Sequence, residues 1–585
     1  MNTGGDSVLP ETASDIAKAR ILPGCEWSPP FRNIGAVLSD RVRNAPDKNF
    51  LSYCDDALEA TRWSYREFQE TALRVARLMQ YDMRVDVGDR IATMSVNDPR
   101  TVFIYFAAWL IGAVVVPINC SEDDERVNFI LNNADAKALF ISADQVSRVR
   151  KINVGDRTTN TYPSLSSLSS DLGLESGGIN SPERMVEIDH LGGDFDSLVA
   201  SRPPLEALPD LAPESECLIV YTSGTTGAPK GVVLEQQNLI ADAQSIAEWN
   251  HFGPDDRAMC VLPIHHVNGT VVTLVTPMFS GGSVVLNRRF HAGGFWRTLA
   301  EERCTWVSVV PTVLAILNDR REDISNLDLT AFRHIICGAG PLTVELARRF
   351  DEAFGVRVVH GYGLSETTCY SCFLPIDLAH KSYHHWMFEC GFPSIGCPIP
   401  ANEMAIHDAD GRSLSPDARG EIVVRGYNVM RCYFKRPDAN RVTFEHGWFR
   451  SGDEGFYRNG PDGRDYYFIS GRLKELFIRG GINYSPFDID GVLTAIPGVK
   501  AAMAVGFENN FYGEEIGAYV QLEDGVQLTD EYIIEACRKE LPFAKSPKVV
   551  LFGAEFPVTS TGKYQRNKLK PLFAKWKDSQ FREKK

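Results

Sequence analysis

Short apolar runs alternate with amphipathic helical patterns over about residues 30–470 of the chain. The runs include CLIVYT, AMCVLPI, SVVLN, WVSVV, HIIC and RVVHGY. Apolar runs of this length are typical of strands buried on both faces of a sheet, and helices between them supply the covering layers. The alternation therefore predicts an α/β fold built around largely buried sheets.

The pattern changes toward the C-terminus. Short strands bounded by turn residues follow residue 400, as in GEIVVRGY and GRDYYFISGR, and predict a small β unit. A fresh α/β pattern begins near residue 475 with LFIRGGINYSP and VKAAMAVGF. We therefore predict a large N-terminal region of α/β sheet subdomains plus the β unit, residues 1–473, and an α+β C-terminal domain, residues 474–585. The Ser- and Gly-rich residues 155–195 predict a surface loop.

Composition narrows the class of partner. Acidic residues outnumber basic residues by 76 to 61, which gives a net charge of −15 and no global positive field for nucleic acid. The 13 cysteines are an odd number and are scattered, and the N-terminus has no apolar signal core, so we expect a cytoplasmic protein. Residues 101–121 carry no charge, but Gly112 and Pro117 interrupt them. They predict a buried helix, a turn and a short strand, and no membrane span.

A polar loop, YTSGTTGAPKG at residues 221–231, lies between two apolar strand patterns. Its glycines can take positive φ, so consecutive backbone N–H groups can converge on an anion. Its hydroxyl groups add neutral donors and Lys230 adds a cation. The residues that would surround a polyphosphate are Thr222, Ser223, Gly224, Thr225, Thr226, Gly227 and Lys230. The loop is not a Walker A motif, because GxxxxGK[ST] is not satisfied and a strand follows Lys230.

This loop resembles the phosphate loop of the adenylate-forming superfamily, which comprises acyl-CoA synthetases, adenylation domains and luciferases. Further segments match that superfamily in order: LPIHHVNG (262–269), CGAGPL (337–342), HGYGLSE (360–366), GEIVVRGYNVMRCY (420–433), FRSGDEG (449–455), GRLKELFIRGGIN (471–483) and PVTSTGKYQR (557–566). The resemblance covers about residues 30–575 and is closest to acyl-CoA synthetases. Ile478 stands where luciferases commonly have a lysine, which argues against light emission.

The resemblance implies a nucleotide site. Tyr362 would stack on adenine, beside the small residues of the CGAGPL segment, and Asp453 would accept hydrogen bonds from the ribose hydroxyls. Glu366 would bind the Mg²⁺ that accompanies ATP, as a hard oxygen ligand. The residues implied to contact the nucleotide, besides the phosphate loop, are Ala339, Gly340, Pro341, Gly361, Tyr362, Gly363, Ser365, Glu366, Asp453, Arg472 and Lys563.

The resemblance also implies the catalytic groups. Lys563 would lie on a mobile C-terminal domain and offset the repulsion between the acid's carboxylate and the α-phosphate of ATP. Lys230 would hold phosphate, and His266 would line the entrance to the acyl pocket. Lys474 occupies the hinge position of the family. No aspartate is present near His266 to pair with an amino-acid ammonium group.

We therefore expect an AMP-forming acid–CoA ligase that uses ATP, Mg²⁺ and coenzyme A. The segments expected to form the acyl pocket, 266–272, 337–340 and 361–373, are mostly apolar or small, which favours a fatty, alicyclic or aryl acid. One alternative is an acyl-AMP ligase that passes the acyl group to a carrier protein or an amine. A more distant alternative is a non-catalytic AMP or ATP sensor, against which the intact Lys230, Glu366, Asp453 and Lys563 argue.

The cysteines after the Glu366 motif raise a separate question, which is whether they bind a structural zinc ion. Cys369 and Cys372 form a CxxC pair, and Cys390 and Cys397 follow with six residues between them. Zinc ribbons usually repeat the CxxC pair. We therefore favour free cysteines near the acyl pocket.

Overall fold

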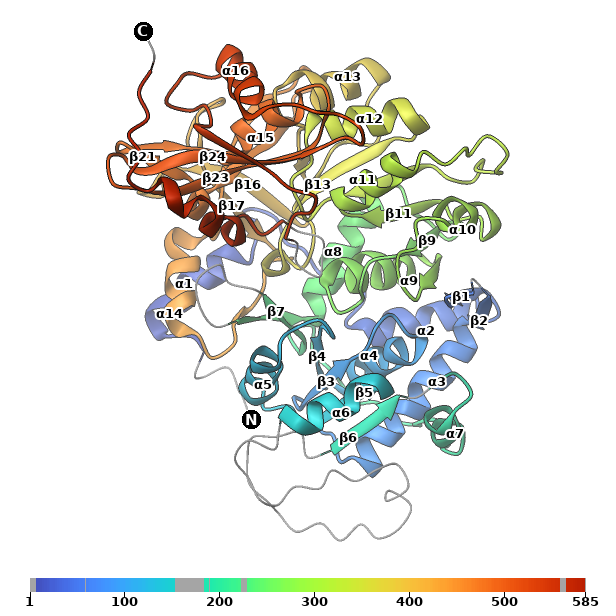
Figure 1. Ribbon diagram of the computed structural model, residues 1–585. Coiled ribbons are helices and arrows are strands. Elements are labelled where there is room, and N and C mark those ends of the chain that lie inside the picture. The colour runs from blue at the N-terminus through green and yellow to red at the C-terminus, as the bar shows by residue number, and fades with distance from the viewer. Residues whose placement is uncertain are drawn as a thin grey trace.

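The computed structural model describes residues 7–57, 59–152, 184–188, 190–222, 229–557 and 564–583. It has a mixed α/β fold with a large N-terminal region and a smaller C-terminal region, which confirms the predicted fold class (Figure 1). The predicted division at residue 473 stays a prediction. Most of the loop predicted at 155–195 lies outside the described residues.

A seven-stranded sheet carries the ends of the predicted phosphate loop. Its order is β18 (Cys432–Tyr433), β8 (Lys230–Glu235), β7 (Glu216–Thr222), β4 (Val114–Ile118), β3 (Arg90–Met94), β5 (Ala138–Ser142) and β6 (Arg184–Ile188). The strands from β7 to β6 pair in parallel, whereas β8 is antiparallel to both β7 and β18. Thr222 and Lys230 therefore lie opposite each other at one edge of the hairpin.

Residues 101–121 form a buried helix and a buried strand in this region. Helix α4 (Pro99–Ile111) is buried along its whole length and ends at Gly112, whose φ of 76° allows the turn into β4. The predicted helix, turn and strand are thus confirmed. Among the described residues, no helix combines the length and the apolar character needed to cross a membrane.

A nine-stranded sheet forms the second half of the N-terminal region. Its order is β15 (Cys397–Pro398), β14 (Cys372–Phe373), β13 (Val358–Tyr362), β12 (His334–Cys337), β11 (Trp306–Val309), β9 (Arg257–Cys260), β10 (Ser283–Asn287), β1 (Asn49–Cys54) and β2 (Ala60–Ser64). The strands from β13 to β1 are parallel, so the carboxyl ends of β11, β12 and β13 meet at one edge.

Two smaller sheets follow. The predicted β unit is an antiparallel sheet in the order β16 (Asn402–His407), β17 (Gly420–Gly426), β19 (Phe449–Asn459) and β20 (Asp465–Arg472). The C-terminal sheet has the order β22 (Ile482–Tyr484), β21 (Phe477–Arg479), β24 (Gly513–Leu522) and β23 (Val499–Asn509), with β25 (Val549–Phe552) beside β24. Helices α15 (Pro486–Thr494) and α16 (Asp530–Glu540) accompany it, and α15 contacts α12 (Val344–Phe354) of the N-terminal region (Figure 1).

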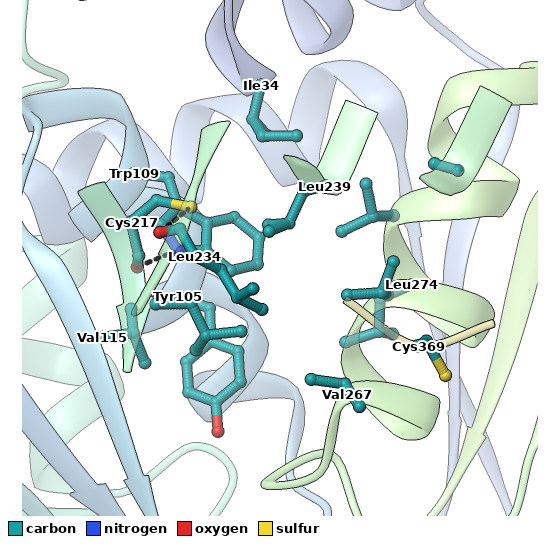
Figure 2. Packing of buried hydrophobic residues seen from close by; sticks show 14 of the residues in the cluster. Ile34, Tyr105, Trp109, Val115, Cys217, Leu234, Leu239, Val267, Leu274 and Cys369 are labelled. Atoms are coloured by element: carbon teal, nitrogen blue, oxygen red, sulfur yellow. Dashed lines mark hydrogen bonds between the residues drawn. The ribbon is translucent and has the colours of Figure 1, made fainter. Parts of the chain in front are cut away.

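The remaining α-helices lie around the large and small sheets. They are α1 (Pro10–Ala19), α2 (Ile34–Asn44), α3 (Tyr65–Arg77), α5 (Asp124–Asn133), α6 (Ala143–Ile152), α7 (Asp194–Ala200), α8 (Gln236–Trp249), α9 (Thr276–Ser280), α10 (Phe295–Glu301), α11 (Pro311–Arg320), α13 (His380–His384) and α14 (Pro437–Thr443). One buried cluster joins residues of both sheets. In it, Trp109 Nε1 on α4 donates to the carbonyl oxygen of Cys217 at 2.8 Å (Figure 2).

A buried carboxyl group lies within helix α8, behind the carboxyl edge of the second sheet. Asp242 is fully buried, and Asn428 Nδ2 donates to its Oδ1 at 3.2 Å. Burial raises the pKa of this carboxyl well above its ordinary value, and hydrogen bonds from Asn428 and the backbone of Tyr370 oppose the shift only in part. The carboxyl is therefore neutral over a range of pH in which an unfolded chain would ionise it.

Replacing this residue, as Asp242→Asn, should change how stability depends on pH. A folded-state pKa above the unfolded value means that the wild type is stabilised below the unfolded pKa, near 4, and loses stability as pH rises toward the folded pKa. Asparagine does not titrate. The melting temperature of the variant minus that of the wild type should therefore increase as pH rises above about 4, because only the wild type loses stability there, by up to about 1.4 kcal/mol per pH unit. A difference that stays constant with pH would show that Asp242 is ionised when folded.

Candidate nucleotide and acid site

The described residues of the predicted site gather where strands of the two large sheets end. Thr222 and Lys230 lie at the loop end of the β7–β8 hairpin, and His266 lies just before the helical segment η5 (Asn268–Val275). The others lie directly after β12 (Ala339, Gly340, Pro341), at the end of β13 (Gly361, Tyr362, Gly363), in the turn η6 (Ser365, Glu366) and on the paired strands β19 and β20 (Asp453, Arg472). The predicted residues Ser223, Gly224, Thr225, Thr226, Gly227 and Lys563 lie outside the described residues.

Glu366 is held by a tyrosine from another sheet. Its side chain is 9% exposed, and its Oε1 accepts a hydrogen bond from the hydroxyl of Tyr433 at 2.7 Å. The ammonium group of Lys230 lies 4.5 Å from the centroid of the same tyrosine ring. A carboxylate and a cation thus flank one aromatic ring at the mouth of the phosphate loop. An oxygen ligand suited to a metal ion and a cation suited to a phosphate therefore lie close together.

Burial lowers the pKa of Lys230. The carboxylate of Glu366 acts in the opposite direction, and the nearby cation of Lys474 adds to the lowering. Lys474, at the predicted hinge, is therefore near enough to Lys230 for the two charges to interact. A bound polyphosphate would favour the charged form of Lys230, since an anion nearby stabilises an ammonium group.

Asp453, on strand β19 of the small β sheet, is hydrogen-bonded to Tyr362 at the end of β13. It is 2% exposed; its Oδ2 accepts from the hydroxyl of Tyr362 at 2.7 Å, and its Oδ1 lies 3.0 Å from Nε of Arg472. Asp453 and Arg472 face each other in the register of β19 and β20. The aromatic ring, the carboxylate and the guanidinium are therefore held in one connected set, with donors and acceptors that suit a ribose.

Two residues beside this set have a positive φ although they are not glycine. Ala339 has a φ of 64° and Thr368 a φ of 63°. The hydroxyl of Thr368 donates to the carbonyl oxygen of Asn428 at 2.6 Å, which helps to hold the strained turn. Conformations of this kind cost on the order of 1–3 kcal/mol, so the surrounding structure has to hold them in place.

The two adjacent histidines lie at the boundary between the sheets. Their ring centroids are 4.4 Å apart. Burial lowers the pKa of His265 to about 4, so this ring is neutral near pH 7. His265 also lines a cavity of about 380 Å³ together with Asn97, Thr312, Arg288 and Arg289. The predicted site residue His266 is not part of that lining.

Tyr564, the first described residue after Lys563, senses a charge of the N-terminal region. Burial raises the pKa of the Tyr564 phenol, with a further contribution from Asp319 on α11. Ion pairs join the same two regions. Lys500 Nζ lies 2.7 Å from Oδ2 of Asp319, and Arg349 Nη1 on α12 lies 3.1 Å from Oε1 of Glu523.

The sequence interpretation missed several residues of the site. Tyr433 ends one of the family motifs, but its hydrogen bond to Glu366 was not predicted. Tyr370 and Asn268, which pair beside the strand ends, were not predicted as site residues either. No signal in the sequence joins partners so far apart along the chain. Among the described residues there is no group of three or more histidine, cysteine, aspartate or glutamate side chains that could hold a metal ion.

Comparisons with known proteins match almost the whole chain. A family model described as AMP-binding enzyme matches residues 38–434, and one described as AMP-binding enzyme C-terminal domain matches residues 488–563. The sulfoacetate–CoA ligase of Cupriavidus necator is 33% identical over 92% of this chain and 97% of its own length. The oxalate–CoA ligase of Arabidopsis thaliana is 30% identical over 91% and 97%.

A solved structure shares the fold over a similar span. The o-succinylbenzoate CoA synthetase of Bacillus subtilis, in complex with its acyl-adenylate intermediate, has a TM-score of 0.75 and 26% identity. The similarity covers 91% of this chain and 97% of that chain.

Proposed function

Since the chain belongs to the AMP-binding enzyme family and is an AMP-forming acid–CoA ligase, we propose that the residues gathered at the strand ends carry out both steps of its reaction. The enzyme uses ATP to join a carboxylic acid to coenzyme A through an acyl-adenylate. The observation that carries the proposal is the linked placement of Glu366, Tyr433 and Lys230 beside Tyr362, Asp453 and Arg472.

In the first step, a carboxylate oxygen of the acid attacks the α-phosphorus of ATP, and the bond to pyrophosphate breaks. The phosphate-loop residues Thr222, Ser223, Gly224, Thr225, Thr226, Gly227 and Lys230 hold the phosphates, and Ser365 binds the α-phosphate. Lys563 lies between the two anions as negative charge builds up, and a preorganised cation there lowers the barrier.

The nucleoside is held by the connected set at the ends of β13, β19 and β20. Asp453 accepts from the ribose hydroxyls, and Arg472, already 3.0 Å from Asp453, supports it from the hinge side. The adenine lies against Tyr362 and the segment Ala339, Gly340 and Pro341, and Gly361 and Gly363 allow the backbone to approach.

Glu366 fits a role as the protein's ligand to Mg²⁺. It is a hard oxygen donor, its orientation is fixed by Tyr433, and Mg²⁺ commonly takes one or two protein carboxylates together with phosphate oxygens and water. When bound, Mg²⁺ neutralises phosphate charge.

In the second step, the thiol of coenzyme A attacks the acyl carbonyl group and AMP leaves. We propose that residues 474–585 rotate about Lys474 between the steps, so that Lys563 leaves the site and the turn at residues 480–481 approaches the pantetheine. His266 lines the entrance to the acyl pocket. Transfer of the acyl group to a carrier protein or an amine stays a prediction. It is tested by supplying either acceptor in place of coenzyme A in the assay.

The acid is not an amino acid in this proposal, because the segment around His266, LPIHHVNG, contains no aspartate or glutamate to pair with an ammonium group. The segments 266–272, 337–340 and 361–373 expected to surround the acid include Val271, Cys337 and Phe373, all fully buried. The relatives are named for acids as different as sulfoacetate, oxalate and o-succinylbenzoate, so the class of acid has to be argued from this chain's own pocket.

The Mg²⁺ assignment is tested by Glu366→Gln, which keeps the shape of the side chain and removes its charge. The Mg²⁺ concentration needed for half-maximal ATP–pyrophosphate exchange should rise by about tenfold or more. Tyr433→Phe, which removes only the hydrogen bond to Glu366, should cause a smaller rise. An unchanged Mg²⁺ dependence, or a melting temperature far below that of the wild type, would mean that Glu366 has a structural role instead.

A further inference from the structure

A tyrosine ring occupies the space between the ends of β12 and β13, where the proposed function places the acid. Gly338 follows β12 directly and Gly361 lies in β13. A Cβ atom built on Gly338 would lie 2.8 Å from the hydroxyl oxygen of Tyr370, and one built on Gly361 would lie 2.8 Å from Cε1 of the same ring. Two glycines thus leave room beside the site, and Tyr370 fills it.

The ring is fixed in this position from several sides. Tyr370 is 1% exposed, and its ring centroid lies 4.3 Å from that of Phe373. Asn428 Nδ2 donates to the carbonyl oxygen of Tyr370 at 2.9 Å, and the same amide also contacts Asp242 and Asn402. An acid longer than the space in front of the ring would have to displace a side chain that is packed and bonded on its far side.

The wall in front of the ring is polar. Asn268 Nδ2 donates to the hydroxyl oxygen of Tyr370 at 3.2 Å. Burial raises the pKa of this phenol well above its ordinary value, and the nearby Ser308 hydroxyl opposes that rise only in part. Asn268 is 7% exposed, and its Oδ1 has no hydrogen-bond partner among the described residues. A buried polar atom left unpaired costs about 1–3 kcal/mol, so this wall favours a ligand that supplies a polar partner.

We propose that Tyr370 and Asn268 determine the specificity of the enzyme, restricting it to short carboxylic acids, of about two to four carbons, whose far end carries a hydrogen-bonding group. The inference rests on the proposed function, which places the acid at this edge of the sheet, and it replaces the fatty, alicyclic or aryl acid that the sequence of these segments favours. Tyr370 sets the length limit through its volume. The phenol hydroxyl and the Asn268 amide select a polar far end, such as a hydroxyl, carboxylate or sulfonate group.

The cavity beside His265 offers a different location for an anionic far end. Its two arginines, however, are both paired with one carboxylate: Arg288 Nε and Arg289 Nε lie 3.3 and 2.9 Å from oxygens of Asp56. Their side chains are 43% and 71% exposed. Solvated, already paired guanidinium groups attract an anion weakly. Arg289→Ala therefore serves as the control for this alternative.

The test measures AMP and acyl-CoA formation for acetate, glycolate, malonate, sulfoacetate, hexanoate, octanoate and benzoate. The wild type should turn over glycolate, malonate or sulfoacetate with a kcat/KM at least about tenfold above that for octanoate and benzoate. Tyr370→Ala, with Tyr370→Leu as a second variant if alanine unfolds the chain, should raise kcat/KM for hexanoate and octanoate by at least about tenfold. A gain of activity cannot be produced by misfolding.

Tyr370→Phe separates volume from polarity. It should still exclude octanoate, while the preference for a polar far end over acetate should fall by at least about tenfold. A wild type that turns over octanoate as fast as the short acids, or an alanine or leucine variant that gains no long-acid activity while it keeps short-acid activity, would overturn the inference alone. A loss of the polar preference in Arg289→Ala, with no loss in Tyr370→Phe, would also overturn it. If none of these acids supported AMP formation, in the wild type or in any variant, the proposed function itself would be contradicted.

Discussion

Replacing Lys563 with alanine should slow acyl-adenylate formation by at least about 10²-fold, while thioester formation from supplied acyl-AMP continues near its normal rate. In the first step an anionic carboxylate approaches an anionic phosphate, and a cation between them stabilises the transition state more than the ground state. The second step brings a thiol to a carbonyl group that is already activated and needs no such cation. The measurement is the rate of each half-reaction, with acyl-AMP quantified directly.

Lys568 provides a matched control for this prediction. It is an exposed lysine in the same C-terminal segment, so Lys568→Ala removes the same charge from the same domain and should leave both half-reactions unchanged. Burial raises the pKa of the Tyr564 phenol, and Asp319 of the N-terminal region adds to the rise. An equal loss in both half-reactions for Lys563→Ala would indicate misfolding or a different role.

Lys474→Pro should damage the second step selectively. If residues 474–585 rotate between the steps, the hinge residue must absorb a large change in φ and ψ, and proline fixes φ near −65°. We expect acyl-AMP formation to continue while transfer to coenzyme A falls by at least about tenfold, roughly 1.4 kcal/mol of barrier. Single-turnover kinetics of each half-reaction measure the two effects separately.

Contacts across the two regions support this expectation. The ion pairs of Lys500 with Asp319 and of Arg349 with Glu523 join the C-terminal region to α11 and α12, so a rotation has to break them. Lys474→Ala, which leaves φ free, should transfer the acyl group at close to the wild-type rate. Transfer at wild-type speed in the proline variant would rule out the rotating-domain mechanism for this protein.

The local features of the fold could be predicted from the sequence, because each depends on a few neighbouring residues. The turn at Gly112, the strand after it and the small antiparallel sheet after residue 400 follow from short patterns. The order of strands could not be predicted. The early strand β1 pairs with β10, more than 200 residues later, and Arg20 before the first sheet forms an ion pair with Glu235 at the start of α8.

The same distinction applies to the site. Motifs indicate which residues face a nucleotide, because glycines, hydroxyl groups and charges at fixed spacing along the chain bind the same ligand group. Tertiary packing decides which side chain holds another, as Tyr433 holds Glu366 and Asn268 holds Tyr370. These partners are 67 and 102 residues apart. The chemistry of the reaction was therefore predictable, whereas the size and polarity of the acid pocket emerge only from the folded chain.

The central claim is that this chain joins an acid to coenzyme A through a bound acyl-adenylate. A rapid-quench single turnover tests it most directly: enzyme in excess is mixed with MgATP and an accepted acid, and coenzyme A is added after a delay. The account predicts that acyl-AMP and pyrophosphate accumulate in equal amounts before the addition. Acyl-AMP should then disappear at the rate at which acyl-CoA and AMP form. Release of ADP and phosphate, or acyl-CoA formation with no preceding acyl-AMP, would contradict the account.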